Sequence, residues 1–182
     1  REHLPVLAAC TRVLHGGLGS AQFIVGAAWG TRGMIDRIVH ADESSIPPIR
    51  VVEGRTYDCM AASDLLITAS GTATLEAAIL GVPMVIIYRG TPVMRLEYHL
   101  RKSILEDFIG MPNIVADRGV CPELINEDVT PEKVAEIAMS ILTDEDRLNR
   151  MKTELHEVAL RLGERGAVDR AARLVLEMGG LA

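Results

Sequence analysis

The stretch with the clearest potential for chemistry is 63–78, where four small residues separate an apolar run from a helical one. These four residues are Ser70, Gly71, Thr72 and Ala73. Small side chains let an anion reach the first N–H groups of a helix, which are unpaired and carry the positive end of its dipole. Glu76 follows about one turn later, and its carboxylate can accept hydrogen bonds from two adjacent ribose hydroxyls. A turn for phosphate beside an acid for a diol is typical of a nucleotide site.

A second interpretation of the same stretch stays open at this point. The small residues can form only a tight strand-to-helix turn, and Glu76 can be an ordinary charge on a helix. The stretch has neither the GxGxxG spacing of dinucleotide-binding folds nor the GK[ST] of P-loops. Those two classes of nucleotide-binding protein are therefore disfavoured.

The segments around this turn alternate between strand and helix patterns. Strands are expected at 21–28, 49–53, 64–69 and 83–88, and helices at 1–16, around Asp36, at 55–63 and at 71–80. The last two strands are continuous apolar runs, which is typical of strands covered on both faces. The pattern predicts an α/β fold, with a Rossmann-like parallel sheet and helices on both faces. Ligands bind where the strands of such sheets end, and the turn at 70–73 follows one of these strands.

The C-terminal third is predicted to be helical. Residues 110–126 have the glycine and proline content of a loop, and Thr130 followed by Pro131 predicts a helix to about residue 142. Two further helices are expected at about 143–162 and at 167–178. Charged residues near the end of the first, Glu154 and Arg161 among them, are expected to form a solvated face.

Residues 92–109 form an amphipathic, partly basic segment. Two interpretations of it are open: an ordinary packing helix, or a segment that lies against an anionic membrane or guides acyl chains. The acidic residues Glu97, Glu106 and Asp107 weaken the membrane interpretation.

Composition restricts the classes of function. The 182 residues suit one domain or half of a two-domain enzyme. The net charge of −6 and an aromatic content of 3% argue against nucleic-acid binding. Cys10, Cys59 and Cys121 are expected to be buried thiols of a cytoplasmic protein, and the histidines form no metal-binding pattern. No signal or membrane-spanning segment is expected. A domain of this kind seldom starts with a helix that has no strand before it, so we expect the sequence to be truncated at its N-terminus.

Two separated motifs carry a family resemblance. The first comprises Ala62-Ser63-Asp64, residues 69–76, Pro83-Met84-Val85 and Tyr88-Arg89; the second is residues 111–126, followed by Thr130-Pro131-Glu132. In this order they resemble the nucleotide-sugar-binding half of a GT-B glycosyltransferase, and most closely the lipid-A-disaccharide synthase family. The resemblance extends over essentially all 182 residues. Three positions depart from it: Asp117 stands for a glycine, Gly119 for an acidic residue and Asn126 for a glutamine.

The resemblance implies that residues 1–182 are a GT-B C-terminal domain that binds the donor, a UDP-sugar. Its first strand is expected to be missing, as is the N-terminal acceptor domain that carries the general base. The implied reaction transfers 2,3-diacylglucosamine from UDP-2,3-diacylglucosamine to 2,3-diacylglucosamine 1-phosphate (lipid X). UDP is released, and neither a metal nor another cofactor is implied. We expect the chain to keep donor-site residues without completing a catalytic cycle alone.

The resemblance assigns roles to the residues that match its motifs. The turn at 70–73 would hold the diphosphate of the donor, and Glu76 would hold its ribose. Asn113 would position the donor phosphate or sugar. Tyr88 and Arg89 would lie beside the same crevice, and an interface role is the alternative for Arg89.

Arg118 and Glu123 have two interpretations. They either contact the donor directly or form an ion pair with each other that holds the loop. The choice between them is left open by the sequence.

The resemblance also implies partners and a location. These are the two lipid substrates, an anionic membrane surface, and the cytoplasmic face of the inner membrane of a Gram-negative-type bacterium; no nucleic acid is implied, and a homo-oligomer is left open. Two other classes of protein compete with this interpretation. One is another GT-B enzyme that uses a UDP-sugar, such as an epimerase or a cell-wall glucosaminyltransferase. The other is a non-catalytic Rossmann-like binding module, for which no nucleotide affinity is expected.

Overall fold

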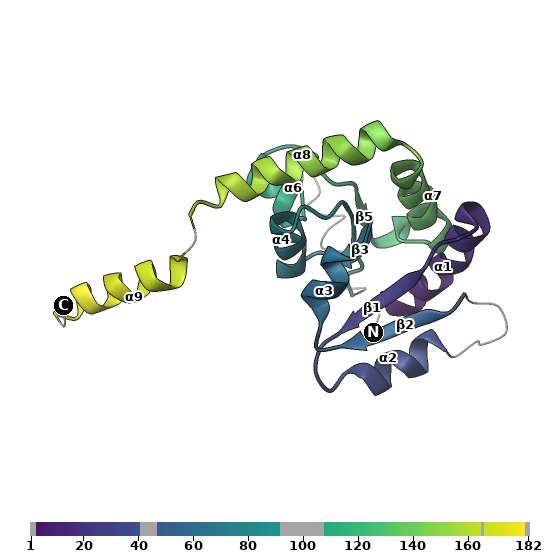
Figure 1. Ribbon diagram of the computed structural model, residues 1–182, viewed down its shortest axis with the longest axis horizontal. Helices are drawn as coiled ribbons and strands as arrows, with labels where there is room; N and C mark the ends of the chain where they lie inside the picture. The colour runs from purple at the N-terminus through teal and green to yellow at the C-terminus, as the bar shows by residue number, and fades with distance from the viewer. Residues whose placement is uncertain (1–2, 41–46, 92–107, 165, 181–182) are drawn as a thin grey trace.

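A computed structural model describes residues 3–40, 47–91, 108–164 and 166–180 of the chain (Figure 1). In the first half, helices and strands alternate as predicted. The elements are α1 (Leu4–Leu18), β1 (Phe23–Ala27), α2 (Arg32–Val39), β2 (Ile49–Glu53), α3 (Thr56–Ala61), β3 (Leu66–Ala69), α4 (Thr72–Ile79) and β4 (Met84–Tyr88). The second half contains α6 (Met111–Ala116), β5 (Glu123–Ile125), a 3-10 turn (Asn126–Asp128), α7 (Pro131–Leu142), α8 (Glu145–Arg161) and α9 (Ala167–Met178).

The strands form two parallel sheets. β1 pairs with β2, and β4 lies between β3 and β5. Every pair is parallel, so the predicted α/β class with a Rossmann-like sheet is confirmed. The division into two sheets was not predicted, and among the described residues β1 and β3 do not pair with each other.

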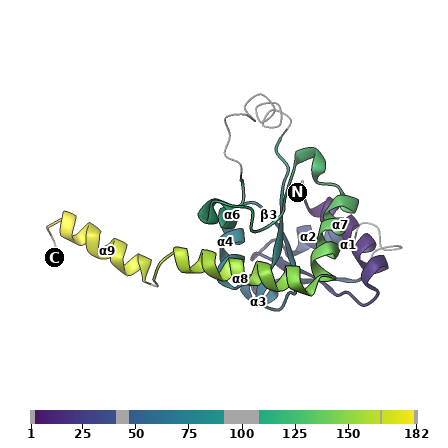
Figure 2. The same ribbon diagram turned by 90° about the horizontal axis from the view of Figure 1, so that it is seen from above.

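Helices cover both faces of the three-stranded sheet. α4 and α6 lie on one side of it and α1 and α7 on the other, in both views (Figures 1 and 2). The continuous apolar run Val85-Ile86-Ile87 is completely buried in β4, because that strand is central and is packed from both faces. β3 is only half-buried along its length, because no strand among the described residues pairs with one of its edges.

Helix α1 connects the cores of the two sheets. Its Cys10 and Leu14 belong to the apolar cluster around β4, whereas its Ala8 belongs to a smaller cluster built on β1, α2 and β2. Phe23 of β1 packs against both clusters. The two sheets therefore share a covering helix although their strands do not pair.

The prediction of a loop at 110–126 was wrong. This stretch contains α6, whose first turn accommodates Pro112, and β5, which extends the sheet beyond β4. Glycine and proline mark element ends as often as loops, and here they delimit two short elements. Asp117 ends α6 in the left-handed conformation, with φ 55°.

The cap predicted at Thr130 is confirmed, and the structure adds a second one at Asp144. The side chain of Thr130 accepts a hydrogen bond from the N–H of Lys133 at the start of α7. Asp144 accepts one from the N–H of Arg147 at the start of α8. α9 stands apart from the other elements in both views, and none of its side chains is buried (Figures 1 and 2).

Two predictions concern membranes. The amphipathic segment at 92–109 lies almost entirely outside the described residues, so its two interpretations both stay predictions. Within the described ranges, none of the helices combines the length and the apolar character that crossing a bilayer requires.

Two of the three cysteines are buried as expected. Cys10 and Cys121 are inaccessible, and burial raises the pKa of each thiol to about 12. Cys59 is only half-buried, and all three are free.

Candidate functional site

The turn between β3 and α4 has a backbone that only glycine adopts readily. Gly71 precedes the helix with φ 154° and ψ −169°, a region that L side chains rarely enter. A Cβ at this position would meet no atom within 4 Å, so the space above the turn is open. Thr72 and Ala73 are the first two helical residues, whose N–H groups have no acceptor within the helix. The turn therefore presents backbone donors to an unfilled space.

Ser70 holds this turn in place. Its N–H donates to the carbonyl of Ile87 at 2.9 Å, and its hydroxyl donates to the carbonyl of Ile109 at 2.7 Å. Thr74 closes the turn from the other side, where its hydroxyl donates to the carbonyl of Gly71 at 2.7 Å. Of the four small residues, Ser70 is thus engaged with its neighbours, whereas Gly71 and Thr72 are exposed.

Glu76 has a partner that the sequence did not reveal. The hydroxyl of Tyr57, at the start of α3, donates to Oε1 of Glu76 at 3.0 Å. This hydrogen bond and the charge of Glu76 raise the pKa of Tyr57. Tyr57 is 59% exposed, and nineteen positions separate it from Glu76 in the sequence, so no local pattern pointed to the pair. The bond orients the carboxylate and leaves Oε2 available to another donor.

Tyr88 and Arg89 follow β4 at the edge where β3 also ends. Ala69 pairs with Ile87, so the two residues after Ile87 run alongside the start of the turn. Both are half-buried. The N–H of Arg89 donates to Nε2 of His3 at 3.0 Å, which places the first turn of α1 at the same edge. The predicted neighbourhood of these residues and the turn is therefore present.

Asn113 is turned inward and bonded within its own segment. Only 1% of the residue is exposed. Its Oδ1 accepts hydrogen bonds from the N–H groups of Val120 and Cys121, both at 2.8 Å. Its Nδ2 donates to the carbonyl of Cys121 and to Oε1 of Glu123, both at 2.7 Å. Asn113 therefore shapes the segment, and a role in positioning the donor stays a prediction.

Glu123 connects that segment to the turn. Its carboxylate accepts hydrogen bonds from the N–H groups of Ile109 at 2.9 Å and Gly110 at 2.8 Å, as well as from Asn113. Ile109 in turn accepts the hydroxyl of Ser70. A continuous chain of hydrogen bonds thus runs from Asn113 through Glu123 and Ile109 to Ser70.

The predicted alternative of an Arg118–Glu123 ion pair was wrong. Arg118 pairs with Glu154 and Glu157 of α8, and its pKa is raised, first by the hydrogen bond that it donates to Glu154. The carboxylate oxygens of Glu123 already accept hydrogen bonds from backbone N–H groups of its own segment, which satisfy them without a cation. Arg118 lies with α8 because the segment after α6 packs there.

The expected solvated face of α8 is exposed at Lys152 and Arg161, but two of its residues also bind other segments. Arg161 donates from Nη1 to the carbonyls of Val115 and Ala116, at 3.1 and 3.0 Å. These are carbonyls in the last turn of α6, which its own hydrogen bonds leave unpaired. Glu154, as described, pairs with Arg118. Both residues therefore fasten α6 to α8.

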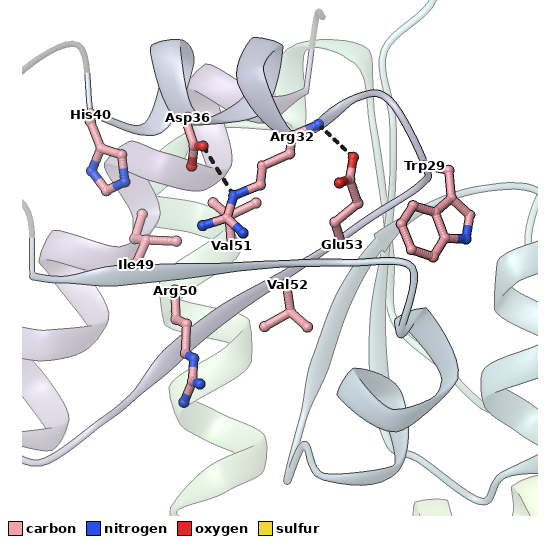
Figure 3. A pocket seen from close by; sticks show the side chains of 9 residues that line it. All are labelled: Trp29, Arg32, Asp36, His40, Ile49, Arg50, Val51, Val52 and Glu53. Carbon is pink, nitrogen blue, oxygen red and sulfur yellow. Dashed lines mark hydrogen bonds and ion pairs between the residues drawn. The ribbon is translucent and has the colours of Figure 1, made fainter.

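Away from this turn, a hollow of about 550 Å³ lies along β2 and α2 (Figure 3). At its end Glu53 accepts the N–H of Gly30 at 2.8 Å and that of Arg32 at 3.4 Å, and Arg32 pairs with Asp36. Trp29 stands at its rim and is 80% exposed. The acidic side chains of this hollow are thus bonded to α2 and to the turn before it, and we assign no ligand to it.

Comparison with known proteins gives one consistent result. The sequence model of the family described as lipid-A-disaccharide synthetase matches residues 31–178. The lipid-A-disaccharide synthase of Syntrophus aciditrophicus is 38% identical over 178 residues, which are 96% of this chain and 45% of that protein. The protein of the same name from Persephonella marina is 32% identical over 96% of this chain and 46% of its own length. That from Nitrosococcus oceani is 41% identical over 72% of this chain and 33% of its own.

The chain spans less than half the length of each of these curated relatives. The family model nevertheless covers well over half of the chain, including the turn at 70–73, Glu76 and the network around Asn113. The chain belongs to the lipid-A-disaccharide synthetase family.

Proposed function

We propose that this chain is the donor-binding half of a glycosyltransferase of lipid A biosynthesis. The donor would be UDP-2,3-diacylglucosamine and the acceptor 2,3-diacylglucosamine 1-phosphate, with UDP as the leaving group. The observation that carries the proposal is the juxtaposition of the Gly71 turn and Glu76 at the end of β3, in a chain of this family. Ligands of open α/β sheets bind at this edge.

In this proposal the turn stabilises the charge that develops on the leaving diphosphate. The N–H groups of Gly71, Thr72 and Ala73 and the dipole of α4 act as fixed donors, which need no reorganisation during the reaction. The open space above Gly71 lets the phosphate oxygens come close to the backbone. Arg89, at the end of the neighbouring strand, would add a positive charge beside the same group.

Glu76 would bind the ribose of the donor. With Oε1 held by Tyr57, Oε2 is free to accept a hydrogen bond from a ribose hydroxyl, and Oε1 has a second lone pair for the other. The acceptor hydroxyl must lose a proton to a general base. None of the residues assigned here serves as that base, which the proposal places on the other half of the enzyme.

Three residues have positioning roles in this scheme: Asn113, Glu123 and Ser70. Their hydrogen bonds fix residues 109–110 against the turn, so that the donor would bind beside a rigid backbone segment. Direct contact of Asn113 with the donor would require its side chain to leave four hydrogen bonds. Arg118 is bound to α8 and serves that packing.

Calorimetric titration of UDP into the purified 182-residue chain tests the site. Glu76→Ala should weaken UDP binding by about tenfold or more, the scale of a charged hydrogen bond in a binding site. Glu136→Ala removes the same charge from an exposed position of α7 and should leave the affinity unchanged. UDP binding that is absent, or that is equal in the three proteins, would count against the site.

A second experiment tests the substrate. The longer protein that carries this chain should consume UDP-2,3-diacylglucosamine in the presence of the lipid acceptor and leave UDP-GlcNAc unchanged. Turnover of UDP-GlcNAc alone would favour the competing epimerase or cell-wall enzyme. Comparable use of both donors would also contradict the proposal.

A further inference from the structure

The chain that leaves β4 runs on beyond the residues that pair with its two neighbouring strands. The last pair on one side is Ala69–Ile87, and the last pair on the other is Tyr88–Ile125. β3 then enters the turn before α4, and β5 enters the 3-10 turn. Arg89 follows both pairs, so its position is set by contacts other than the regular ladder of the sheet.

Two side chains act as acceptors for the backbone of this segment. The N–H of Arg89 donates to Nε2 of His3 at 3.0 Å, and the N–H of Gly90 donates to Oδ1 of Asn126, also at 3.0 Å. The partners of these two bonds are 86 and 36 positions apart in the sequence. Two consecutive backbone donors are therefore held by side chains from two distant parts of the chain.

His3 stands on the side of β3. The N–H of Ser70, just after β3, donates to the carbonyl of Ile87, so the backbone groups of Ile87 face β3. Alternate residues of a strand face the same neighbour, and Arg89 therefore directs its N–H to that side as well. At this level β3 has already turned towards α4, and the imidazole of His3 supplies the acceptor.

Asn126 stands on the side of β5. The N–H of Ile86 donates to the carbonyl of Pro122, just before β5, so Gly90, four positions later, directs its N–H to the same side. Asn126 follows β5 in the left-handed conformation, with φ 53°, where the pairing with β4 ends. Asparagine adopts this conformation more readily than most residues. Its side chain, in a residue that is only 3% exposed, then supplies the acceptor.

These two bonds fix the backbone of Arg89 beside the turn before α4. Ala69 pairs with Ile87, so the residues that follow Ile87 run alongside the start of that turn. An arginine side chain has many rotamers, and it binds an anion at a lower entropic cost when its backbone is already fixed. Holding the N–H groups on both sides of the Arg89 Cα therefore fixes where the charged side chain begins.

We propose that His3 and Asn126 are positioning residues that hold Arg89 beside the diphosphate of the donor. Neither contacts the donor, and each acts on Arg89 through a backbone N–H group. The inference rests on the proposed function, which assigns the diphosphate to the turn before α4 and a supporting positive charge to Arg89. It adds the two residues on which the position of that charge depends.

Calorimetric titration of UDP into variants of the 182-residue chain tests the inference. Asn126→Ala and His3→Leu each remove one acceptor, and each should raise the Kd for UDP about threefold to tenfold, the scale of one hydrogen bond. His3→Gln keeps a side-chain acceptor of similar reach and should stay within about twofold of the unmodified chain. His15→Leu makes the same substitution at an exposed position of α1 and should leave the Kd unchanged.

A double-mutant cycle with Arg89→Met separates positioning from a general structural effect. In that background Asn126→Ala and His3→Leu should each change the Kd by less than about twofold, because the charge that they position is gone. Amide exchange reports on the bonds without UDP: it should accelerate at Gly90 in Asn126→Ala and at Arg89 in His3→Leu. His3 is only half-buried, so its variants carry the test if Asn126→Ala does not fold.

Three results would overturn the inference. One is that the His3 and Asn126 variants bind UDP as the unmodified chain does. Another is that their effect is undiminished in the Arg89→Met background, which would show that they act on the fold and not through Arg89. The third is that His3→Gln weakens binding as much as His3→Leu. In each case the dependence of UDP binding on Glu76 is a separate readout, so the proposed function would stand. Absence of UDP binding to the unmodified chain would overturn both.

Discussion

Asn113 and Glu123 share a hydrogen bond of 2.7 Å that joins the first turn of α6 to the start of β5. Through Glu123 this bond reaches Ile109, and through Ile109 it reaches Ser70 in the turn before α4. The buried side chain of Asn113 therefore helps to hold residues 109–110 against the turn before α4.

Asn113→Ala should destabilise the fold strongly. It leaves the buried N–H groups of Val120 and Cys121 without an acceptor and removes a donor from Glu123. Each of the two orphaned N–H groups costs about 1–3 kcal/mol, so we expect a loss of about 2–6 kcal/mol in urea unfolding. The matched variant Asn149→Ala, at an exposed position of α8, should change stability by less than about 0.5 kcal/mol. Equal stability of the two variants would contradict this account of Asn113.

Tyr57→Phe should weaken UDP binding without unfolding the protein. The variant removes only the hydroxyl that orients Glu76. We expect an increase of about threefold to tenfold in the Kd for UDP, measured by calorimetry. In a Glu76→Gln background the same change should have a smaller effect, because the two residues act as a pair. An effect of equal size in both backgrounds would show that Tyr57 acts independently of Glu76.

Gly71→Ala should cost stability although the position is open. A side chain there meets no neighbour, so the penalty comes from φ 154° alone, and we expect about 1–3 kcal/mol by thermal or urea unfolding. UDP affinity should also fall, because the methyl group occupies the approach to the turn. Gly33→Ala is the control: it lies in α2 with open space around it and no positive φ, and should be neutral or slightly stabilising.

Asp117→Gly should stabilise the chain. Asp117 ends α6 with φ 55°, where glycine carries no Cβ penalty. We expect a gain of about 1 kcal/mol in unfolding experiments, the lower end of the cost of the left-handed region for an L residue. Asn126→Gly is the informative contrast, since Asn126 also has a positive φ but its side chain accepts the N–H of Gly90 at 3.0 Å. That variant should destabilise, and a gain from it would refute the role given to this bond.

Stability should fall in alkali because of two buried thiols. Burial raises the pKa of Cys10 and Cys121 from an ordinary value of 9.0 to about 12. Above pH 9 the unfolded chain releases these protons and the folded chain keeps them, so the unfolded state gains stability with rising pH. Each thiol should contribute a slope of about 1.4 kcal/mol per pH unit between 9 and 12. Cys10→Ala should reduce the slope of unfolding free energy against pH; an unchanged slope would contradict the assignment.

Local sequence patterns determined most of the elements. The strand at Ile49–Glu53 and the helix at Ala167–Met178 have the predicted bounds, and Thr130 caps α7 as predicted. These features depend on residues within a few positions of each other, through periodicity, caps and the conformational freedom of glycine. For the same reason the turn before α4 and the family motifs could be recognised from the sequence.

Tertiary structure alone decided which side chains meet. Tyr57 reaches Glu76 across nineteen positions, and Arg118 reaches α8 instead of Glu123, because packing of elements distant in sequence sets these distances. The inward orientation of Asn113 could not be predicted from the sequence either, because an asparagine beside a proline suits a surface loop as well as a buried position. A groove of about 920 Å³ between β1 and β3 is a further case, because residues of four elements distant in sequence, β1, β3, α1 and α3, line it.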